Sequence, residues 1–171
     1  MKTKMILALL VFATSIVSYS QISKAEIVAT GLTCSMCSNA INKQLKALPE
    51  VETVVTDLDR NTFTVTLKKD TDISPLRLKQ SVEKAGFFVG SMVITLQLEQ
   101  SALAADGTIA KENNVYIFVD DSGKQNGEEI RARVIDKGFV TQKEYKKLIK
   151  SMTKYPSYIA DTEKTYHLKL I

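Results

Sequence analysis

The stretch from Gly31 to Cys37 constrains this chain more than any other, because it holds both cysteines of the sequence, in C-x-x-C spacing. An alternating run from Glu26 to Gly31 predicts a short strand that ends at the glycine, and the cysteines follow directly. Two thiols on a turn between a strand and a helix can bind one soft metal ion or close into a disulfide. The spacing alone leaves both outcomes open.

Helical and strand patterns alternate in the residues that follow the cysteines. Leu78, Val82 and Ala85, for example, recur at i, i+4 and i+7, which is the spacing of one buried helix face. The resulting order, βαββαβ, predicts a ferredoxin-like fold in which two helices cover one face of an antiparallel sheet. The predicted elements are a strand at 26–31, a helix from Cys37 to Pro49, a hairpin of strands at 51–57 and 62–68, a helix from Ser74 to Gly86 and a strand at 87–96.

The sequence from about residue 97 onward carries weaker patterns. We predict a smaller α+β module of unknown role over residues 98–171, entered through a linker from Ser101 to Asn114. The alternative, that these residues extend the first domain, stays open. The patterns predict strands at 115–119, 130–134 and 166–170, a break at Asp120-Asp121-Ser122-Gly123, and a helix that begins at Thr141-Gln142-Lys143-Glu144, in capping-box spacing, and ends before Pro156.

The first twenty residues are typical of a secretory signal peptide. Two lysines precede an apolar run from Met5 to Val17, and small residues precede a cleavage site before Gln21; a second possible site lies before Glu26. The apolar run is shorter than the roughly 18 residues that a membrane-spanning helix needs. We therefore expect a periplasmic or secreted protein that is soluble and has no stable membrane anchor after cleavage.

The charge balance names no partner. The chain has a net charge of +4, and removing residues 1–20 takes away two lysines and no acid, which leaves about +2. Lysines are mixed with acids, and no basic stripe with interleaved aromatic residues suggests a nucleic-acid surface. We expect the Glu128-Glu129 pair and the cluster of Lys143, Lys146 and Lys147 to be solvated faces.

The motif Gly31-Leu32-Thr33-Cys34-Ser35-Met36-Cys37, with Ala85-Gly86-Phe87 before the fourth strand, resembles the heavy-metal-associated domain over about residues 26–96. That family includes copper chaperones, periplasmic mercury-binding proteins and the amino-terminal modules of metal-pumping ATPases. The resemblance departs at Leu32, where methionine is commoner in the family. It implies that Cys34 and Cys37 bind the metal, and that the partners are a metal-transporting membrane protein or another metal carrier.

The chemistry of the cysteines agrees with this resemblance. A thiolate is favoured near a helix amino terminus, where Cys37 is predicted to lie. Two thiolates without a third local ligand suit Cu(I), or the Hg(II) that the family also binds, better than Zn(II), which usually takes four ligands. We favour Cu(I) and leave Hg(II), Zn(II) or another soft ion open. Passing the ion to a partner's thiols needs no catalytic group, so we expect a carrier and not an enzyme.

Two other functions remain open. The same cysteine pair could serve a thiol–disulfide oxidoreductase, although thioredoxin-like motifs commonly carry tryptophan where this chain has Thr33. Alternatively, residues 98–171 bind a protein partner and the metal site regulates that binding. The sequence specifies neither the metal, the donor and acceptor, the redox state of the cysteines nor the oligomeric state.

Single residues near and far from the motif also receive expected roles. We expect Met36 to be a loop side chain without metal contact, and the resemblance implies that Leu32 packs beneath the loop. Phe87 either shields the loop or belongs to the core. His167 is the only histidine, and we expect an exposed strand residue that binds no metal.

Overall fold

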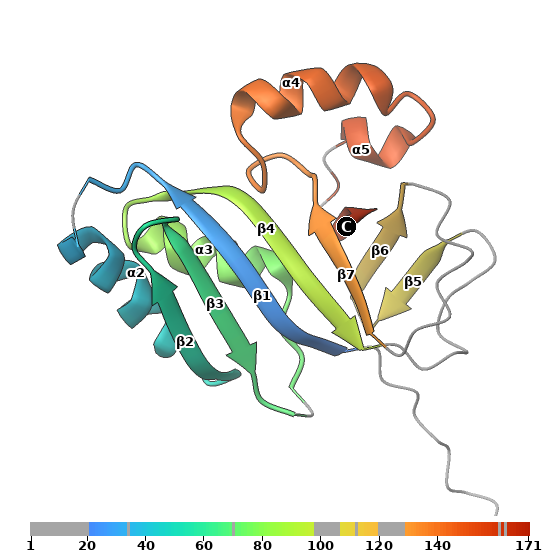
Figure 1. Cartoon of the computed structure of the whole chain (residues 1–171). Helices are drawn as coiled ribbons and strands as arrows, with labels where there is room; N and C mark the ends of the chain where they lie inside the picture. The colour runs from blue at the N-terminus through green and yellow to red at the C-terminus, as the bar shows by residue number, and fades with distance from the viewer. Residues whose placement is uncertain are drawn as a thin grey trace, which may run out of the picture.

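Strands from both ends of the chain join one sheet in the computed structural model, which describes residues 21–33, 35–69, 71–97, 107–111, 113–119, 129–160, 162 and 164–171. The sheet has eight strands in the order β2-β3-β1-β4-β7-β8-β6-β5 (Figure 1). The elements are β1 (Gln21–Thr30), α2 (Ser35–Lys46), β2 (Val51–Asp57), β3 (Thr62–Leu67), α3 (Pro75–Lys84), β4 (Phe88–Gln97), β5 (Thr108–Lys111), β6 (Asn114–Phe118), β7 (Glu129–Val134), α4 (Gln142–Ser151), α5 (Pro156–Ala160) and β8 (Thr165–Leu170).

The first four strands and two helices have the predicted ferredoxin-like arrangement. Strands β2, β3, β1 and β4 are neighbours in that order and all pair antiparallel, so Ile27 lies opposite both Phe63 and Met92. Helices α2 and α3 cover one face of these strands (Figure 1). This part of the fold-class prediction is confirmed.

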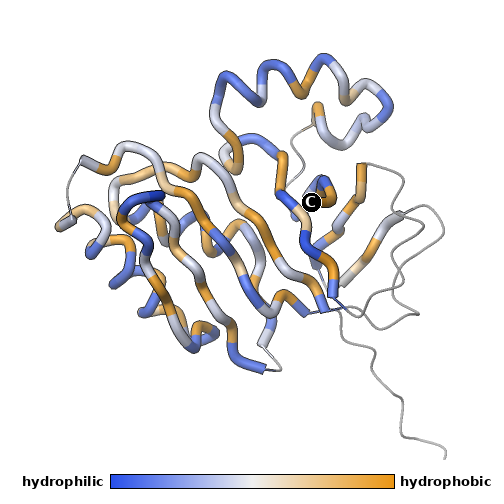
Figure 2. The backbone as a smooth tube through the Cα atoms, viewed as in Figure 1, coloured by the Kyte–Doolittle hydropathy of each residue, from blue (hydrophilic) through white to orange (hydrophobic). Residues whose placement is uncertain are grey.

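The core between the helices and the sheet consists of the predicted helix stripes and one face of each strand. Ile41 and Leu45 of α2 and Leu78 and Val82 of α3 have no exposed surface, and neither has Ile27 of β1. Apolar and polar residues therefore alternate along the strands (Figure 2), as expected for a sheet with one buried face.

Strand β1 begins five residues earlier than predicted. Gln21 pairs with Gln97, and the register between β1 and β4 shifts between Ile22 and Lys24. This irregularity interrupts the alternation that reveals a strand in sequence. Ile22 and Ala25 are nevertheless buried, with 4% and 0% of their surface exposed.

The carboxy-terminal strands continue the sheet of the first part. Strand β7 pairs antiparallel with β4 from Met92↔Val134 to Gln97↔Glu129. Strand β8 then lies between β7 and β6, antiparallel to β7 and parallel to β6. Strands β5 to β8 thus extend the sheet of the first part. Whether residues 98–171 form a separate module stays a prediction.

One prediction for this second part needs correction, and two other predictions lie outside the described residues. The stretch from Ser101 to Asn114 is not only a linker, because Thr108–Lys111 forms β5, pairs with β6 and buries Ile109 to 1% exposure. The predicted break at 120–123 and the signal segment at 1–20 lie outside the described residues. Across the residues that are described, no helix is both long and apolar enough to cross a membrane.

Candidate metal centre

The cysteine motif lies at the connection from β1 to α2, as predicted. Strand β1 ends at Thr30, Gly31 has a φ of +87°, and α2 begins at Ser35. A positive φ is readily adopted by glycine, which explains this residue at the point where the chain leaves the sheet. Cys37 is partly buried in the first turn of α2, whereas Cys34 lies outside the described residues.

Leu32 and Phe87 connect the motif to the core. Both are partly buried and pack against the main hydrophobic cluster. A side chain added at Gly31 would meet Cδ1 of Phe87 at 3.8 Å, so Phe87 lies beside the first residue of the motif. Leu32 therefore packs as expected, and Phe87 both belongs to the core and contacts the start of the loop.

The outer side of the motif is open and carries two exposed apolar side chains beside several polar ones. Met36 is 80% exposed and Leu58, in the turn between β2 and β3, is 55% exposed. A hollow of about 230 Å³ opens here and is lined by Leu32, Thr33, Ser35, Ser38, Leu58 and Asn61. A partner molecule can approach this end of the protein without displacing the core.

The electrostatics of the first turn of α2 suit a negative sulfur. The turn contains no acidic residue, and the basic residues of the helix, Lys43 and Lys46, lie in its last turn. Unpaired backbone N–H groups and the helix dipole favour negative charge at an amino terminus, which is where Cys37 lies. Among the described residues, which do not include Cys34, no group of three or more His, Cys, Asp or Glu side chains could hold a metal ion.

His167 is not the exposed strand residue that we predicted. It is 1% exposed, its Nδ1 lies 2.7 Å from Oδ1 of Asp136, and its backbone N–H donates to Oδ2 of Asp136 at 2.6 Å. Its Nε2 lies 2.9 Å from Oγ of Ser157 in α5. The rings of Tyr155 and Tyr158 pack against the imidazole ring of His167 in edge-to-face geometry. This network holds α5 against β8 and is not part of the motif region.

The burial of His167 follows from α5, which the sequence analysis did not predict. Pro156 was expected only beyond the end of a helix, but it also begins α5, where proline is favourable in the first turn. Tyr166 and His167 are neighbours on β8 and point to opposite faces of the sheet. Tyr166 packs with Phe139 on one face, so α5 covers His167 on the other. The sequence signal that could have indicated α5 was Pro156, a favourable first-turn residue, followed by the apolar ring of Tyr158.

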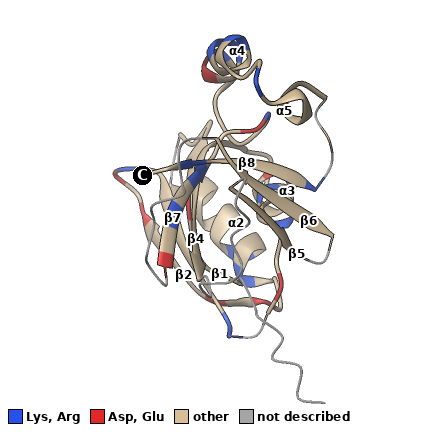
Figure 3. Cartoon of the chain, turned by 90° about the vertical axis from the view of Figure 1, so that its right-hand side faces the viewer, with Lys and Arg blue, Asp and Glu red and all other residues tan. Residues whose placement is uncertain are grey.

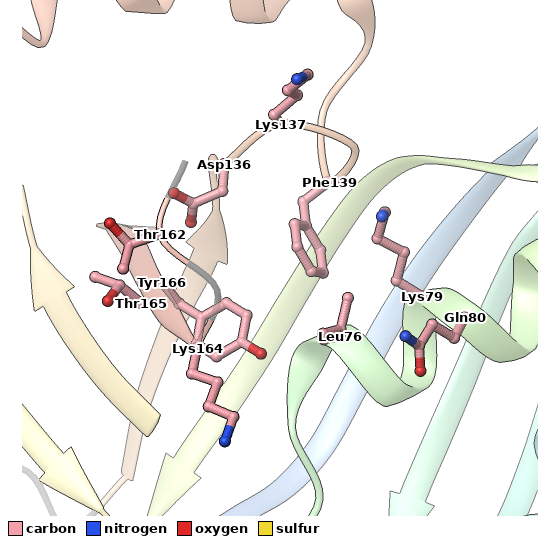
Figure 4. A pocket seen from close by; sticks show the side chains of 10 residues that line it. All are labelled: Leu76, Lys79, Gln80, Asp136, Lys137, Phe139, Thr162, Lys164, Thr165 and Tyr166. Carbon is pink, nitrogen blue, oxygen red and sulfur yellow. The ribbon is translucent and has the colours of Figure 1, made fainter. Parts of the chain in front are cut away.

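A second hollow, of about 280 Å³, lies between α3 and the carboxy-terminal part (Figure 4). Leu76, Phe139 and Tyr166 give it an apolar wall, and Lys137 and Lys164 point away from each other at its rim (Figure 4). The Nζ atom of Lys79 lies 5.8 Å from the centre of the Phe139 ring. This hollow contains no sulfur ligand and is separate from the cysteine motif.

Comparison with known proteins identifies the first part of the chain. Residues 27–88 match the heavy-metal-associated domain family. Among solved structures, the yeast copper transporter domain Ccc2a, described in its apo and Cu(I)-loaded states, is 34% identical; the match covers 38% of this chain and 88% of that one, with a TM-score of 0.35.

A second solved structure is the amino-terminal domain of a potential copper-translocating P-type ATPase from Bacillus subtilis, in its Cu(I)-loaded state. It is 28% identical, and the match covers 50% of this chain and 99% of that one, with a TM-score of 0.37. No curated protein matches the chain significantly. Through residues 27–88, this chain belongs to the heavy-metal-associated domain family.

Proposed function

We propose that this protein binds a soft metal ion, with Cu(I) favoured, through the thiolates of Cys34 and Cys37, and that it carries or sequesters the ion. The observation that carries this proposal is the family match, combined with the place of the C-x-x-C motif between β1 and α2. Soft thiolate ligands suit Cu(I), and two of them without a third ligand fit its low coordination better than the four ligands that Zn(II) usually takes. The position of Cys37 in the first turn of α2 supports the thiolate form.

Transfer to a partner proceeds by ligand exchange in this proposal. Each thiol loses its proton as its sulfur binds the ion and regains one as the ion leaves. An incoming thiolate of the partner binds the metal before a sulfur of this protein departs, so the ion never enters water and keeps its charge. The exposed surroundings of Met36 and Leu58 give a partner the access that this exchange needs. The partner is a metal-transporting membrane protein or another carrier.

We further propose that the protein acts after export, with cleavage before Gln21. Cleavage before Glu26 would remove half of β1, including Ile22 and Ala25, which are buried in the core. Cleavage before Gln21 leaves the whole strand intact. Mass spectrometry of the mature amino terminus from an exporting host tests this proposal: a chain beginning at Gln21 supports it, and an uncleaved chain retained in the cytoplasm contradicts it.

Anaerobic titration with Cu(I) in competition with a colorimetric chelator tests the metal site. The unmodified protein is expected to take Cu(I) from the chelator, and Cys34→Ser and Cys37→Ser are each expected to lose this ability, because one thiolate cannot replace two. Met36→Leu is the matched control, since it removes the third sulfur of the motif and is expected to leave binding unchanged.

The same variants separate a carrier from an oxidoreductase. A carrier exchanges disulfides slowly with a redox buffer and binds Cu(I) tightly. Rapid, metal-independent exchange at the cysteine pair without tight Cu(I) binding would support the oxidoreductase instead. Tight binding retained in Cys34→Ser would contradict the proposed ligands.

A further inference from the structure

Helix α4 carries a stripe of lysines on its outer face. Lys143, Lys146, Lys147 and Lys150 follow the spacing i, i+3, i+4 and i+7, which places them on one side of a helix. All of them are exposed, as is Lys154 just beyond the helix end. Figure 3 shows this basic helix at the edge of the molecule, away from the sheet. We call these residues the α4 lysine face.

The opposite side of α4 fixes its orientation. Tyr145, Leu148, Ile149 and Met152 pack against a second buried cluster that includes Ile135 and Tyr158. The centroids of the Tyr145 and Tyr158 rings lie 5.6 Å apart. Because the apolar side is held against the body of the protein, the lysines must point outward.

The only acidic side chain of α4 does not neutralise this face. Both carboxylate oxygens of Glu144 accept hydrogen bonds from the guanidinium of Arg133, at 2.7 Å each. This bidentate pair directs the charge of Glu144 toward the sheet. Elsewhere lysines lie beside acids, as in the pairs Lys24–Glu26 and Lys79–Glu83. Among the described residues, the α4 lysine face is therefore an uncompensated patch on a surface of otherwise mixed charge.

Helix stability does not explain the stripe. Like charges three and four residues apart destabilise a helix, and every neighbouring pair on this face is lysine with lysine. The arrangement therefore favours a function outside the chain, with a negatively charged partner that relieves the repulsion.

We propose that the α4 lysine face binds the phosphate-rich headgroup surface of an anionic lipid membrane. Clusters of four to eight basic residues on an amphipathic helix are typical of this kind of binding. Lysine attracts phosphate as a point charge and needs no fixed geometry, which suits a fluid surface. Protein interfaces, in contrast, are depleted of lysine and rich in arginine and aromatic residues.

The composition of the face also disfavours single-stranded nucleic acid as its partner. Stacking on bases needs exposed aromatic rings, and the aromatic residue of α4, Tyr145, packs inward. The α4 lysine face thus holds the protein at a lipid surface by charge alone, reversibly and without insertion. This association is independent of the proposed metal site.

Cosedimentation of the chain from Gln21 to Ile171 with vesicles tests the proposal. We expect binding to vesicles that contain phosphatidylglycerol, none to pure phosphatidylcholine, and loss of binding as salt is raised. The triple variant Lys146→Gln, Lys147→Gln, Lys150→Gln should bind about 100-fold more weakly, because each lysine near an anionic surface contributes about fivefold.

A matched control variant removes the same number of positive charges from the ends of two other helices. The variant Lys43→Gln, Lys46→Gln, Lys84→Gln replaces exposed lysines of α2 and α3, and it should keep most of the binding. Equal weakening in both variants would overturn the proposal, since net charge alone would then explain the binding. Absence of binding at low salt, or tighter binding to duplex DNA than to vesicles, would also overturn it. Circular dichroism confirms that both variants are folded.

Discussion

The two parts of the sheet are stabilised in different ways. In residues 21–97 the antiparallel strands, in the order β2-β3-β1-β4, lie under two helices whose residues Ile41, Leu45, Leu78 and Val82 are completely buried. In residues 107–171 a late strand, β8, is inserted between two earlier ones, and α4 buries no residue fully. The second part also contains a polar network around a buried histidine, in which His167 pairs with Asp136. One sheet can therefore combine a region whose helices bury several residues completely, which carries the cysteine motif, with a region whose longer helix buries no residue fully.

The largest expected effect comes from a residue that joins both parts in one core. Leu168 of β8 is fully buried and belongs to the same cluster as Ile27 of β1. Leu168→Ala should lower the free energy of unfolding by about 2–5 kcal/mol, as a large cavity does. Urea unfolding followed by circular dichroism measures this, and hydrogen exchange should show weaker protection in β1 as well as β8.

The neighbouring exposed residue supplies the control for this prediction. Lys169→Ala should change the free energy of unfolding by no more than about 0.5 kcal/mol. If Leu168→Ala weakened protection in residues 107–171 and left β1 to β4 unchanged, the two parts would unfold independently, and the shared core would have no energetic role.

A smaller effect is expected at the polar network that holds α5. Asp136→Ala leaves the backbone N–H and the Nδ1 of buried His167 without their acceptor. The free energy of unfolding should fall by about 2–3 kcal/mol, since unpaired buried polar groups are costly. Urea unfolding measures the change, with exposed Asp59→Ala as control. A change below that of the control would mean that the network contributes nothing to the second part.

The smallest expected change in the free energy of unfolding comes from removing either of two helix caps that have the same geometry. The side chains of Ser74 and Thr141 each accept a hydrogen bond at 3.3 Å from the N–H three residues later, at the starts of α3 and α4. Ser74→Ala should cost about 1 kcal/mol, as a lost cap usually does. Thr141→Ala should cost about 0.5 kcal/mol or less, because α4 can open locally without exposing the main core. A larger effect at Thr141 would reverse the comparison.

Much of the first part could be predicted because its signals are local. The helix stripe of Leu78 and Val82, the Ser74-Pro75 start and the alternation of β3 each report on contacts within a few residues along the chain. The structure has all of these elements. The place of Cys37 at the start of α2 was also predictable, because the strand pattern ends just before it. The ligand role of Cys34 and Cys37 stays a prediction.

The second part could not be predicted as well, because its arrangement depends on distant contacts. The insertion of β8 between β7 and β6 brings Val115 beside Thr165, which no local pattern indicates. The burial of His167 requires Asp136, 31 residues earlier, and a short helix that covers it. Strand β5 is only four residues long, so its alternation is too brief to distinguish it from a linker.

Copper content per chain tests the proposed metal site most directly. The protein is loaded anaerobically with Cu(I), freed of excess metal on a desalting column and measured by elemental analysis. We predict one copper per chain in the unmodified protein and in Met36→Leu, and almost none in the double variant Cys34→Ser, Cys37→Ser. Equal copper in the double variant, or none in the unmodified protein, would contradict a dithiolate metal carrier.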